Sequence, residues 1–187
     1  MEPVTLPESL DTERMHLRRF RFADLDDVVE YASNPEWGRF LPVPVPYKPE
    51  DGEFFLAQRR IEDWGEQCTW AMVLRGRACG GVTLILQHEQ RRAMLGYSVA
   101  RPLWGQGLVL EASRAVIGVA FDTQAWLHKV WANADSRNTG SMRVMEKLGM
   151  TREGCLRGHR QHRGEPLDDV YFGLLRPEWE AATGTPS

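Results

Sequence analysis

The sequence predicts an α/β (α+β) fold in which helices cover both faces of a mixed, largely antiparallel central sheet of about seven strands. Three consecutive segments, 68–75, 78–89 and 91–100, are rich in β-branched and aromatic residues and are separated by short turns. Such segments are typical of an antiparallel meander. A glycine-containing loop follows, and helical and strand patterns then alternate in the order loop-α-β-α-β-β.

The composition is that of an ordinary globular chain. Of its 187 residues, 42% are hydrophobic and 26% are charged, which predicts one domain over residues 1–187 with loose ends at 1–10 and 181–187. A net charge of −3 gives no electrostatic reason to expect nucleic acid or an anionic membrane as partner. The absence of a long apolar run predicts no signal peptide and no membrane span, hence a cytoplasmic protein.

The three cysteines are Cys68, Cys79 and Cys155, and none belongs to a C-x-x-C pair. This spacing favours neither a zinc site nor a redox motif. We expect buried, unreactive free thiols and no metal, with a nucleophilic cysteine as the less favoured alternative.

The N-terminal part predicts one strand and two helices. The strand spans 13–20, where Met15 and Leu17 alternate with charged residues. A first helix begins at Phe22 and ends before Asn34 and Pro35, and a second runs from 49 to 64. Between them, prolines at 42, 44, 46 and 49 remove N–H donors, so this segment is predicted to be an ordered loop or a polyproline-like stretch.

The C-terminal part predicts two helices and three strands. A helix over 107–125 presents one apolar face, and a strand follows over 128–134. A short helix over 138–148 ends at Gly149. Two last strands, 151–158 and 169–175, flank the basic turn HRQHRGEP.

The most informative segment is W-G-Q-G-L, residues 104–108, between a predicted strand and a predicted helix. The first N–H groups of a helix lack intrahelical partners, and the helix dipole is positive at that end. Gly105 and Gly107 have no Cβ, so a phosphate can approach the backbone closely. The loop predicts a phosphate cradle, although glycine turns before helices can also be simple connections.

Three segments together resemble the GNAT superfamily of acyl-CoA-dependent N-acyltransferases, and most of all its ribosomal-protein N-terminal (alanine/serine) acetyltransferase branch. They are GYSVARPLWGQGLVLEA, ADSRNTGSMRVMEKLGM and REGCLRGHRQHRGEPLDDVYFGLLRPEW. The resemblance implies one N-acyltransferase domain whose sheet is splayed at two parallel strands. It also implies acetyl-CoA as co-substrate, no metal, and direct acetyl transfer to a primary amine of a protein N-terminus or a small molecule. A homodimer is a possible assembly, since dimers are common in that superfamily.

By the same resemblance, the pyrophosphate of acetyl-CoA binds the backbone of five consecutive residues, namely Trp104, Gly105, Gln106, Gly107 and Leu108. Two positions depart from the usual pattern: Pro102 stands at the first position of the motif, and Gln106 replaces a basic residue. We expect charge compensation from Arg101 or Arg143, either of which could instead be a solvated surface arginine.

The resemblance further implies where the acyl group reacts. A backbone N–H at Ser98 or Val99 would polarise the thioester carbonyl, and Ser141 would protonate the departing thiolate. Asn138 would hold the pantetheine arm or a water molecule. Asn138 and Ser141 could equally cap the short helix, because both residue types are favoured there.

The general base is the weak point of the resemblance. Many related enzymes carry a glutamate on the strand before the loop, where this chain has Met94. Candidate replacements are His159, His162, Glu165 and Asp168. A hydrophilic hairpin tip explains the histidines equally well, and ordered water or an amine already deprotonated in solution would need no base residue.

The acceptor is expected between the N-terminal helices and the last hairpin. Its candidate lining is Trp37, Phe40, Pro42, Pro44 and Tyr47, which could instead only pack over the sheet. The basic residues of the last turn would favour an acidic peptide or a carboxylate, or would be solvated; they are Arg157, His159, Arg160, His162 and Arg163.

Two other functions compete with acetyl transfer. The missing glutamate at Met94 would suit a non-catalytic acyl-CoA-binding sensor or a partner-docking module. A nucleotide-binding protein is disfavoured, because the chain lacks the G-x-x-x-x-G-K-[S/T] pattern.

Overall fold

One open sheet organises the computed structural model, which describes residues 5–184. Within them the sheet has eight strands in the order β1-β2-β3-β4-β5-β6-β8-β7. The strands are β1 Ser9–Asp11, β2 His16–Arg19, β3 Gln67–Leu74, β4 Arg77–Gln87, β5 Arg92–Val99, β6 Lys129–Asp135, β7 Thr151–His162 and β8 Glu165–Leu175. The neighbours β5 and β6 run parallel, and the other neighbouring pairs are antiparallel. The predicted mixed, largely antiparallel fold is therefore confirmed.

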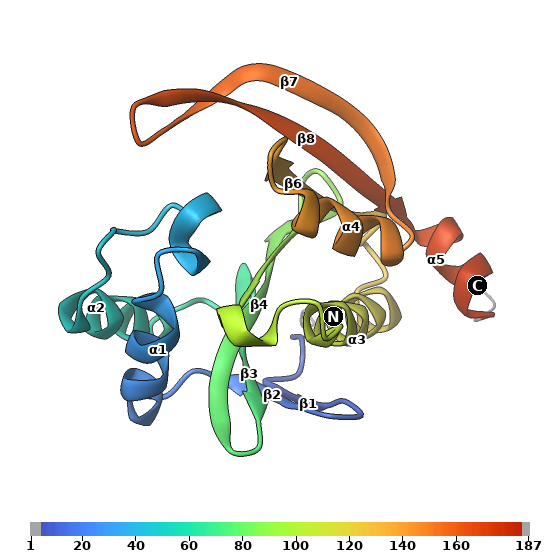
Figure 1. Ribbon diagram of the computed structural model, residues 1–187. Coiled ribbons are helices and arrows are strands. Elements are labelled where there is room, and N and C mark those ends of the chain that lie inside the picture. The colour runs from blue at the N-terminus through green and yellow to red at the C-terminus, as the bar shows by residue number, and fades with distance from the viewer. Residues whose placement is uncertain (1–4, 185–187) are drawn as a thin grey trace.

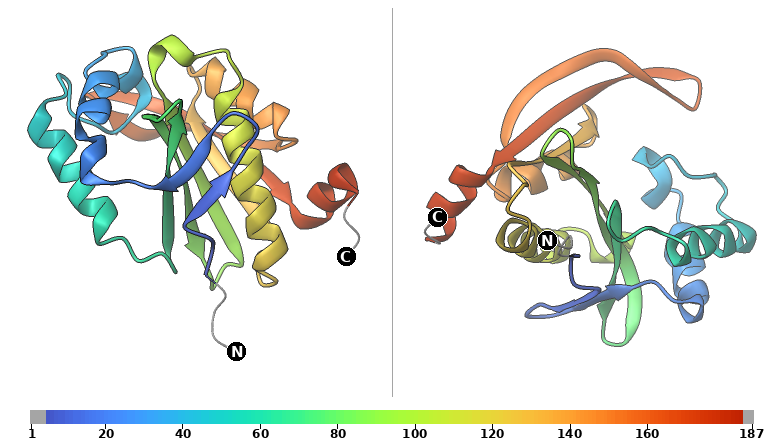
Figure 2. Two further views of the ribbon diagram at one scale, coloured as in Figure 1. Left: turned by 90° about the horizontal axis from the view of Figure 1, so that it is seen from below. Right: turned by 180° about the vertical axis from the view of Figure 1, so that it is seen from behind.

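Helices cover both faces of the sheet (Figure 1). The helices α1 Leu25–Ala32 and α2 Pro49–Arg60 lie on one face, and α3 Leu108–Thr123 and α4 Thr139–Lys147 lie on the other, as Figure 2 shows from two further sides. Helix α5 Arg176–Thr183 follows β8. Three 3-10 turns, η1 Phe22–Asp24, η2 Trp37–Phe40 and η3 Arg101–Leu103, complete the described elements. No helix among residues 5–184 is long and apolar enough to cross a bilayer.

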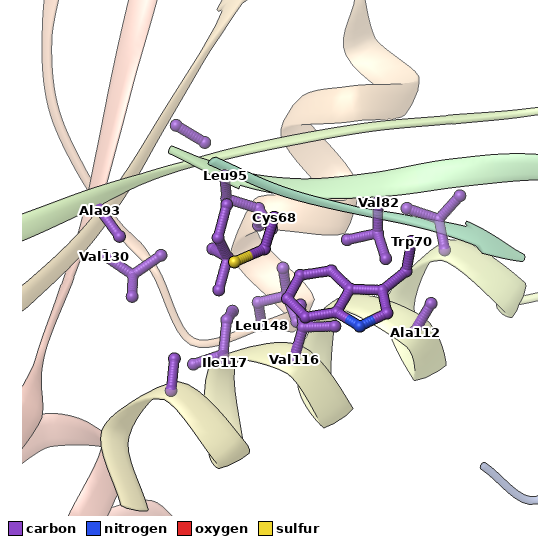
Figure 3. Close-up of a cluster of buried hydrophobic side chains, with 14 of the residues drawn as sticks. Cys68, Trp70, Val82, Ala93, Leu95, Ala112, Val116, Ile117, Val130 and Leu148 are labelled. Atoms are coloured by element: carbon purple, nitrogen blue, oxygen red, sulfur yellow. The ribbon is translucent and has the colours of Figure 1, made fainter. Parts of the chain in front are cut away.

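The larger core lies between the sheet and α3 (Figure 3). Trp70 and Val82 project from the sheet onto Val116 and Ile117 of α3, and all four side chains are fully buried. Because side chains alternate along a strand, Ala71 and Val73 point the other way and join a smaller core under α1 and α2. The two cores hold the ends of β4 and β5 between helices, which positions the loop after β5.

Three sequence predictions about element limits are wrong. Residues 5–10 of the predicted loose tail are ordered, because the buried Leu6 and the half-buried Pro7 accept hydrogen bonds at their carbonyls from the indole N–H groups of Trp64 and Trp70, at 2.7 and 3.0 Å. Helix α2 ends at Arg60, since the chain then turns to bury Trp64. At the C-terminus, residues 181–183 belong to α5, while residues 1–4 and 185–187 lie outside the described part of the chain.

The predicted turn over residues 159–166 is also wrong. Strands β7 and β8 continue to His162 and Glu165, so that only Arg163 and Gly164 form the turn. Both turn residues have positive φ, 52° and 83°, which suits a tight two-residue hairpin connection. The basic residues therefore sit on a long two-stranded hairpin that projects from the sheet edge.

Two of the three cysteines match the expectation. Cys68 and Cys79 are buried free thiols, and burial raises their pKa to about 12 and about 11, respectively. Both stay protonated and unreactive at neutral pH. Cys155 is exposed on β7, so its predicted burial is wrong.

Candidate active site

The glycine loop takes the conformation that its sequence predicts. Gly105 and Gly107 have φ of 78° and 77°, the left-handed region in which a side chain is strained. Gly107 is the residue before the first turn of α3. Within residues 5–184, the N–H groups from Gly105 to Val109 have no hydrogen-bond acceptor. The loop therefore presents a row of free donors at the positive end of a 16-residue helix, which fits a pyrophosphate.

Local contacts fix the path of this loop. The indole N–H of Trp104 donates to the carbonyl of Val99 at 2.8 Å, and the Gln106 amide donates to the carbonyl of Pro102 at 3.1 Å. The predicted cofactor residues Trp104 to Leu108 thus lie together around one turn. Pro102, which departs from the usual motif, is accommodated in η3.

A contact that the sequence did not indicate ties the loop to the β1–β2 connection. Arg14 donates to the Gln106 carbonyl at 2.9 Å and forms an ion pair with Glu111 of α3 at 2.6 Å. Thr12 donates to the same carboxylate at 2.6 Å. Hydrogen bonds from Thr12 and Arg14 outweigh the effect of burial and lower the pKa of Glu111.

The two arginines predicted to compensate phosphate charge lie apart from each other. Arg101 stacks over the Trp104 ring at 4.5 Å, beside the loop, and Arg143 is exposed on α4. In the described part of the chain, Arg14 is the cation that approaches Gly107, with its Nη2 atom 3.6 Å from the position that a Cβ would take there.

The sheet opens next to the loop. Strand pairing between β5 and β6 is limited to three register pairs and ends at Met94 and Trp131. The Arg91 carbonyl accepts a hydrogen bond from His128, while the Ala100 N–H donates to Cys79 on β4. Backbone groups alternate in direction along a strand, so the N–H of Ser98 points to β4, whereas those of Tyr97 and Val99 point into the opening. Of the two predicted carbonyl-polarising donors, Val99 faces the opening and Ser98 does not.

A pair of hydroxyls, Ser141 of α4 and Tyr97 of β5, lies beside this opening. The Asn138 side chain accepts a hydrogen bond from the Ser141 N–H at 3.1 Å and caps the helix, as the capping alternative predicted. The Ser141 hydroxyl lies 2.9 Å from the Tyr97 hydroxyl, which also donates to the Ser141 carbonyl at 3.1 Å. Burial raises the pKa of Tyr97 to about 12, so this phenol stays protonated. Tyr97 was not predicted, because strand alternation gives the direction of its ring but not its partner.

The four candidate bases occupy different places. His159 lies 3.2 Å from the Tyr171 hydroxyl, and Tyr171 stacks on Trp131, the strand neighbour of Met94. His162 donates to the Arg39 carbonyl at 3.1 Å, and Glu165 lies 3.4 Å from Arg137. Asp168 accepts from the Gly158 N–H within the hairpin, a structural role.

The predicted acceptor residues separate into two groups. Trp37 packs against Tyr31 and Tyr47, with ring centroids 5.2 and 6.1 Å apart, and its buried indole N–H has no hydrogen-bond partner among residues 5–184. Phe40 instead lines a cavity of about 340 Å³ between η2 and the hairpin. Trp37 and Tyr47 thus pack beside α1, while Phe40 faces open space.

No metal-binding site is evident among the described residues. Over residues 5–184 there is no group of three or more His, Cys, Asp or Glu side chains able to hold a metal ion. The buried carboxylates are held by arginines instead: Asp135 by Arg137 at 2.6 Å and Asp169 by Arg160 at 2.5 Å.

Comparison with known proteins identifies this arrangement. The chain is 26% identical over 178 residues to an uncharacterized N-acetyltransferase, p20, of Bacillus licheniformis, covering 92% of this chain and 98% of that protein. It is 33% identical over 85 residues to the [ribosomal protein uS5]-alanine N-acetyltransferase of Escherichia coli, covering 46% and 43%. A solved GNAT-family acetyltransferase from Bacillus anthracis superposes with a TM-score of 0.79 at 26% identity, covering 90% and 99%. The acetyltransferase (GNAT) domain model matches residues 14–151. The chain therefore belongs to the GNAT acetyltransferases, enzymes whose co-substrate is acetyl-CoA.

Proposed function

We propose that this enzyme transfers the acetyl group directly to a primary amine while both substrates are bound, without a covalent enzyme intermediate. One observation carries the proposal: two sets of free N–H donors, those of the glycine loop and those of Tyr97 and Val99, lie at the same end of β5. The first set suits a pyrophosphate and the second a carbonyl oxygen that gains negative charge. Acetyl-CoA supplies an activated thioester to this site.

Each side chain at the opening then has a task. The Ser141 hydroxyl, backed by the protonated Tyr97, donates a proton to the sulfur that leaves, and Asn138 holds the first turn of α4 in place. His159 accepts the amine proton, because its partner Tyr171 stacks on the strand neighbour of Met94, where the usual glutamate is missing. The N–C bond forms as the C–S bond breaks, and one proton is removed while another is supplied.

The acceptor that we propose to try first is the N-terminal amine of a protein. The relative in E. coli is named for acetylating the alanine of a ribosomal protein, and this chain shares a third of its residues with it over the matched segment. A small-molecule amine is the second choice.

A non-catalytic acyl-CoA sensor is the competing function, favoured by Met94, which cannot accept a proton. The two functions differ in one observable. An enzyme releases free coenzyme A when an amine is added, whereas a sensor binds acetyl-CoA without releasing it.

Calorimetric titration with acetyl-CoA, with ATP as control ligand, tests the site. We expect micromolar binding of acetyl-CoA alone. The double substitution Gly105→Val and Gly107→Val should weaken it at least tenfold, roughly, because side chains are strained at positive φ and fill the approach to the N–H donors. Gly154→Val, at a glycine of β7 with open space around it, is the matched control. Unchanged affinity in the double variant would refute the proposed cradle.

A further inference from the structure

The cavity of about 340 Å³ beside Phe40 is lined by three segments far apart in the chain: η2, the tip of the β7–β8 hairpin, and Arg137 in the connection between β6 and α4. The hairpin extends from the sheet toward η2, as Figure 1 shows. His162 donates to the Arg39 carbonyl at 3.1 Å, and Arg163 donates to the Gly38 carbonyl at 2.9 Å. These bonds fix the hairpin tip against η2, so the cavity is a built feature of the fold.

The charges around this cavity do not balance. Three arginines line it, Arg39, Arg137 and Arg163, against a single carboxylate, Glu165. Arg137 already forms an ion pair with the buried Asp135 at 2.6 Å. Within residues 5–184, neither Arg39 nor Arg163 has a carboxylate partner within 4.0 Å. Two of the arginines that line the cavity, Arg39 and Arg163, are therefore without a carboxylate counter-charge in the described part of the chain.

The cavity adjoins the proposed reaction centre. Arg137 immediately precedes Asn138, whose side chain caps the helix that carries Ser141. Phe40 adds an apolar surface on the opposite wall. A molecule that places its amine at the opening between β5 and β6 can thus place another part in the cavity.

We propose that this cavity binds an oxyanion, a carboxylate or a phosphate, carried by the amine acceptor. A guanidinium presents N–H donors in a planar fork that matches both groups, and such charge-assisted bonds are among the strongest in proteins. A volume of about 340 Å³ suits a group of side-chain size. The inference rests on the proposed function, since it names the class of acceptor for the same site.

The binding test uses inorganic phosphate as probe, in the presence of saturating coenzyme A so that the glycine loop is occupied. The Nε–Hε NMR signals of the arginines are followed and assigned with Arg39→Lys and Arg163→Lys. We expect the signals of Arg39 and Arg163 to shift with phosphate, while that of Arg152, an exposed arginine of β7 outside the cavity, stays in place. If all three respond alike, or none does, the oxyanion site is refuted.

The kinetic test compares acceptors of equal length: 4-aminobutanoate, 3-aminopropylphosphonate and the neutral 4-aminobutanamide. We expect kcat/KM to be at least about tenfold higher for the anionic acceptors. Arg39→Gln should reduce that preference to near unity, Arg39→Lys should retain most of it, and Arg152→Gln, outside the cavity, should leave it unchanged. The two anionic acceptors tell a carboxylate site from a phosphate site. Equal rates for charged and neutral acceptors in the wild type would overturn the inference.

The two proposals fail in different ways. If the protein binds no acetyl-CoA, or releases no coenzyme A with any amine, the proposed function fails, and the arginine signals still report on the cavity. If it acetylates amines without regard to their charge, the function stands and the oxyanion site falls.

Discussion

The hydroxyl pair of Tyr97 and Ser141 joins the central sheet to α4 at the point where β5 and β6 part. Because burial keeps Tyr97 protonated, both hydroxyl groups are neutral in the resting enzyme, and the pair holds a proton that it can donate. The pair is therefore suited to a general acid, and its removal should affect turnover more than binding.

Ser141→Ala and Tyr97→Phe test this role. Each should lower kcat by about tenfold to a hundredfold while the dissociation constant of acetyl-CoA changes by less than about twofold, since the phosphate cradle is untouched. Stopped-flow kinetics and calorimetry give the two quantities. Thr139→Ala, an exposed residue of the same helix turn, is the control. If both hydroxyl variants turned over as fast as the wild type, the pair would be a structural contact only.

His159 and His162 can be told apart by pH. If His159 takes the amine proton, His159→Ala should lose the acidic limb of the kcat/KM profile, and its rate at pH 7 should fall by about a hundredfold. His162→Ala should keep that limb, because this ring is bonded to the Arg39 carbonyl. A limb that survives in both variants would point to Glu165 or to ordered water.

Side-chain chemistry was only partly predictable from the sequence. The conformation and position of Asn138, Ser141 and the residues from Trp104 to Leu108 could be predicted because these residues belong to local motifs, while their roles stay predictions. Arg14 and Tyr97 were missed because their partners, Gln106 and Ser141, lie 92 and 44 residues away. The choice between Ser98 and Val99 required the strand register, which no local pattern contains.

At the scale of elements, the β1–β2 connection acts as a brace for the glycine loop. It reaches α3 through Glu111 and the loop through the Gln106 carbonyl, so the loop is held from outside as well as by its own turn. A loop held in its bound shape loses less entropy when the ligand arrives.

Glu111→Gln should loosen this brace. We expect acetyl-CoA to bind about fivefold more weakly, since the ion pair with Arg14 is lost while the loop sequence is intact. The measurement is calorimetric titration. Glu146→Gln, an exposed carboxylate of α4, is the matched control. Equal affinity in Glu111→Gln and wild type would show that the loop needs no brace.

The elements themselves were predicted where the pattern is local. The meander β3-β4-β5, helix α3 and the Gly149 stop after α4 follow from alternation, apolar spacing and a helix-ending residue. Strand β1 was missed because the contacts that order its segment are not local: Trp64 and Trp70, distant in sequence, bind the carbonyls of the two residues Leu6 and Pro7 before it, and β1 itself pairs with β2. The hairpin was predicted too short, since the polar residues of β7 resemble a turn, and their pairing with β8 is what makes them a strand.

At the scale of the whole molecule, buried carboxylates paired with arginine govern stability at low pH. Asp24 is buried, which alone would raise its pKa, but hydrogen bonds from Arg18 and from the Arg21 N–H lower the pKa below its usual range. The pKa of Asp135 is lowered chiefly by hydrogen bonds from Arg137. A carboxyl group whose pKa is lower in the folded chain stabilises it above the pKa of the unfolded chain, and this stability is lost as pH falls.

Urea unfolding between pH 7 and pH 2 should therefore show a free energy of unfolding that declines below about pH 5. Asp24→Asn should lower the free energy of unfolding by about 3 kcal/mol at pH 7, because Arg18 is left buried without its partner. Between pH 7 and pH 2, the free energy of unfolding of this variant should then fall by less than that of the wild type. Asp26→Asn, an exposed carboxylate of α1, should behave as wild type. If the free energies of unfolding of Asp24→Asn and of the wild type fell equally with pH, the lowered pKa of Asp24 would be contradicted.

Other whole-molecule expectations stay predictions. They are the single-domain organisation, a homodimer and a cytoplasmic location. None of them follows from one described contact, because each concerns boundaries or partners beyond the sheet and its helices.

The opening between β5 and β6 bears on which amino-acid substitutions this enzyme can tolerate. Its central donors are the peptide N–H groups of Tyr97 and Val99, which every residue except proline possesses. An alanine scan would leave them in place, and so would most natural substitutions along β5. Val99→Pro, or an ester bond introduced at that position by chemical synthesis, removes the donor itself. In the proposed mechanism the reaction therefore depends on main-chain groups, and the side chains around them can vary with the acceptor.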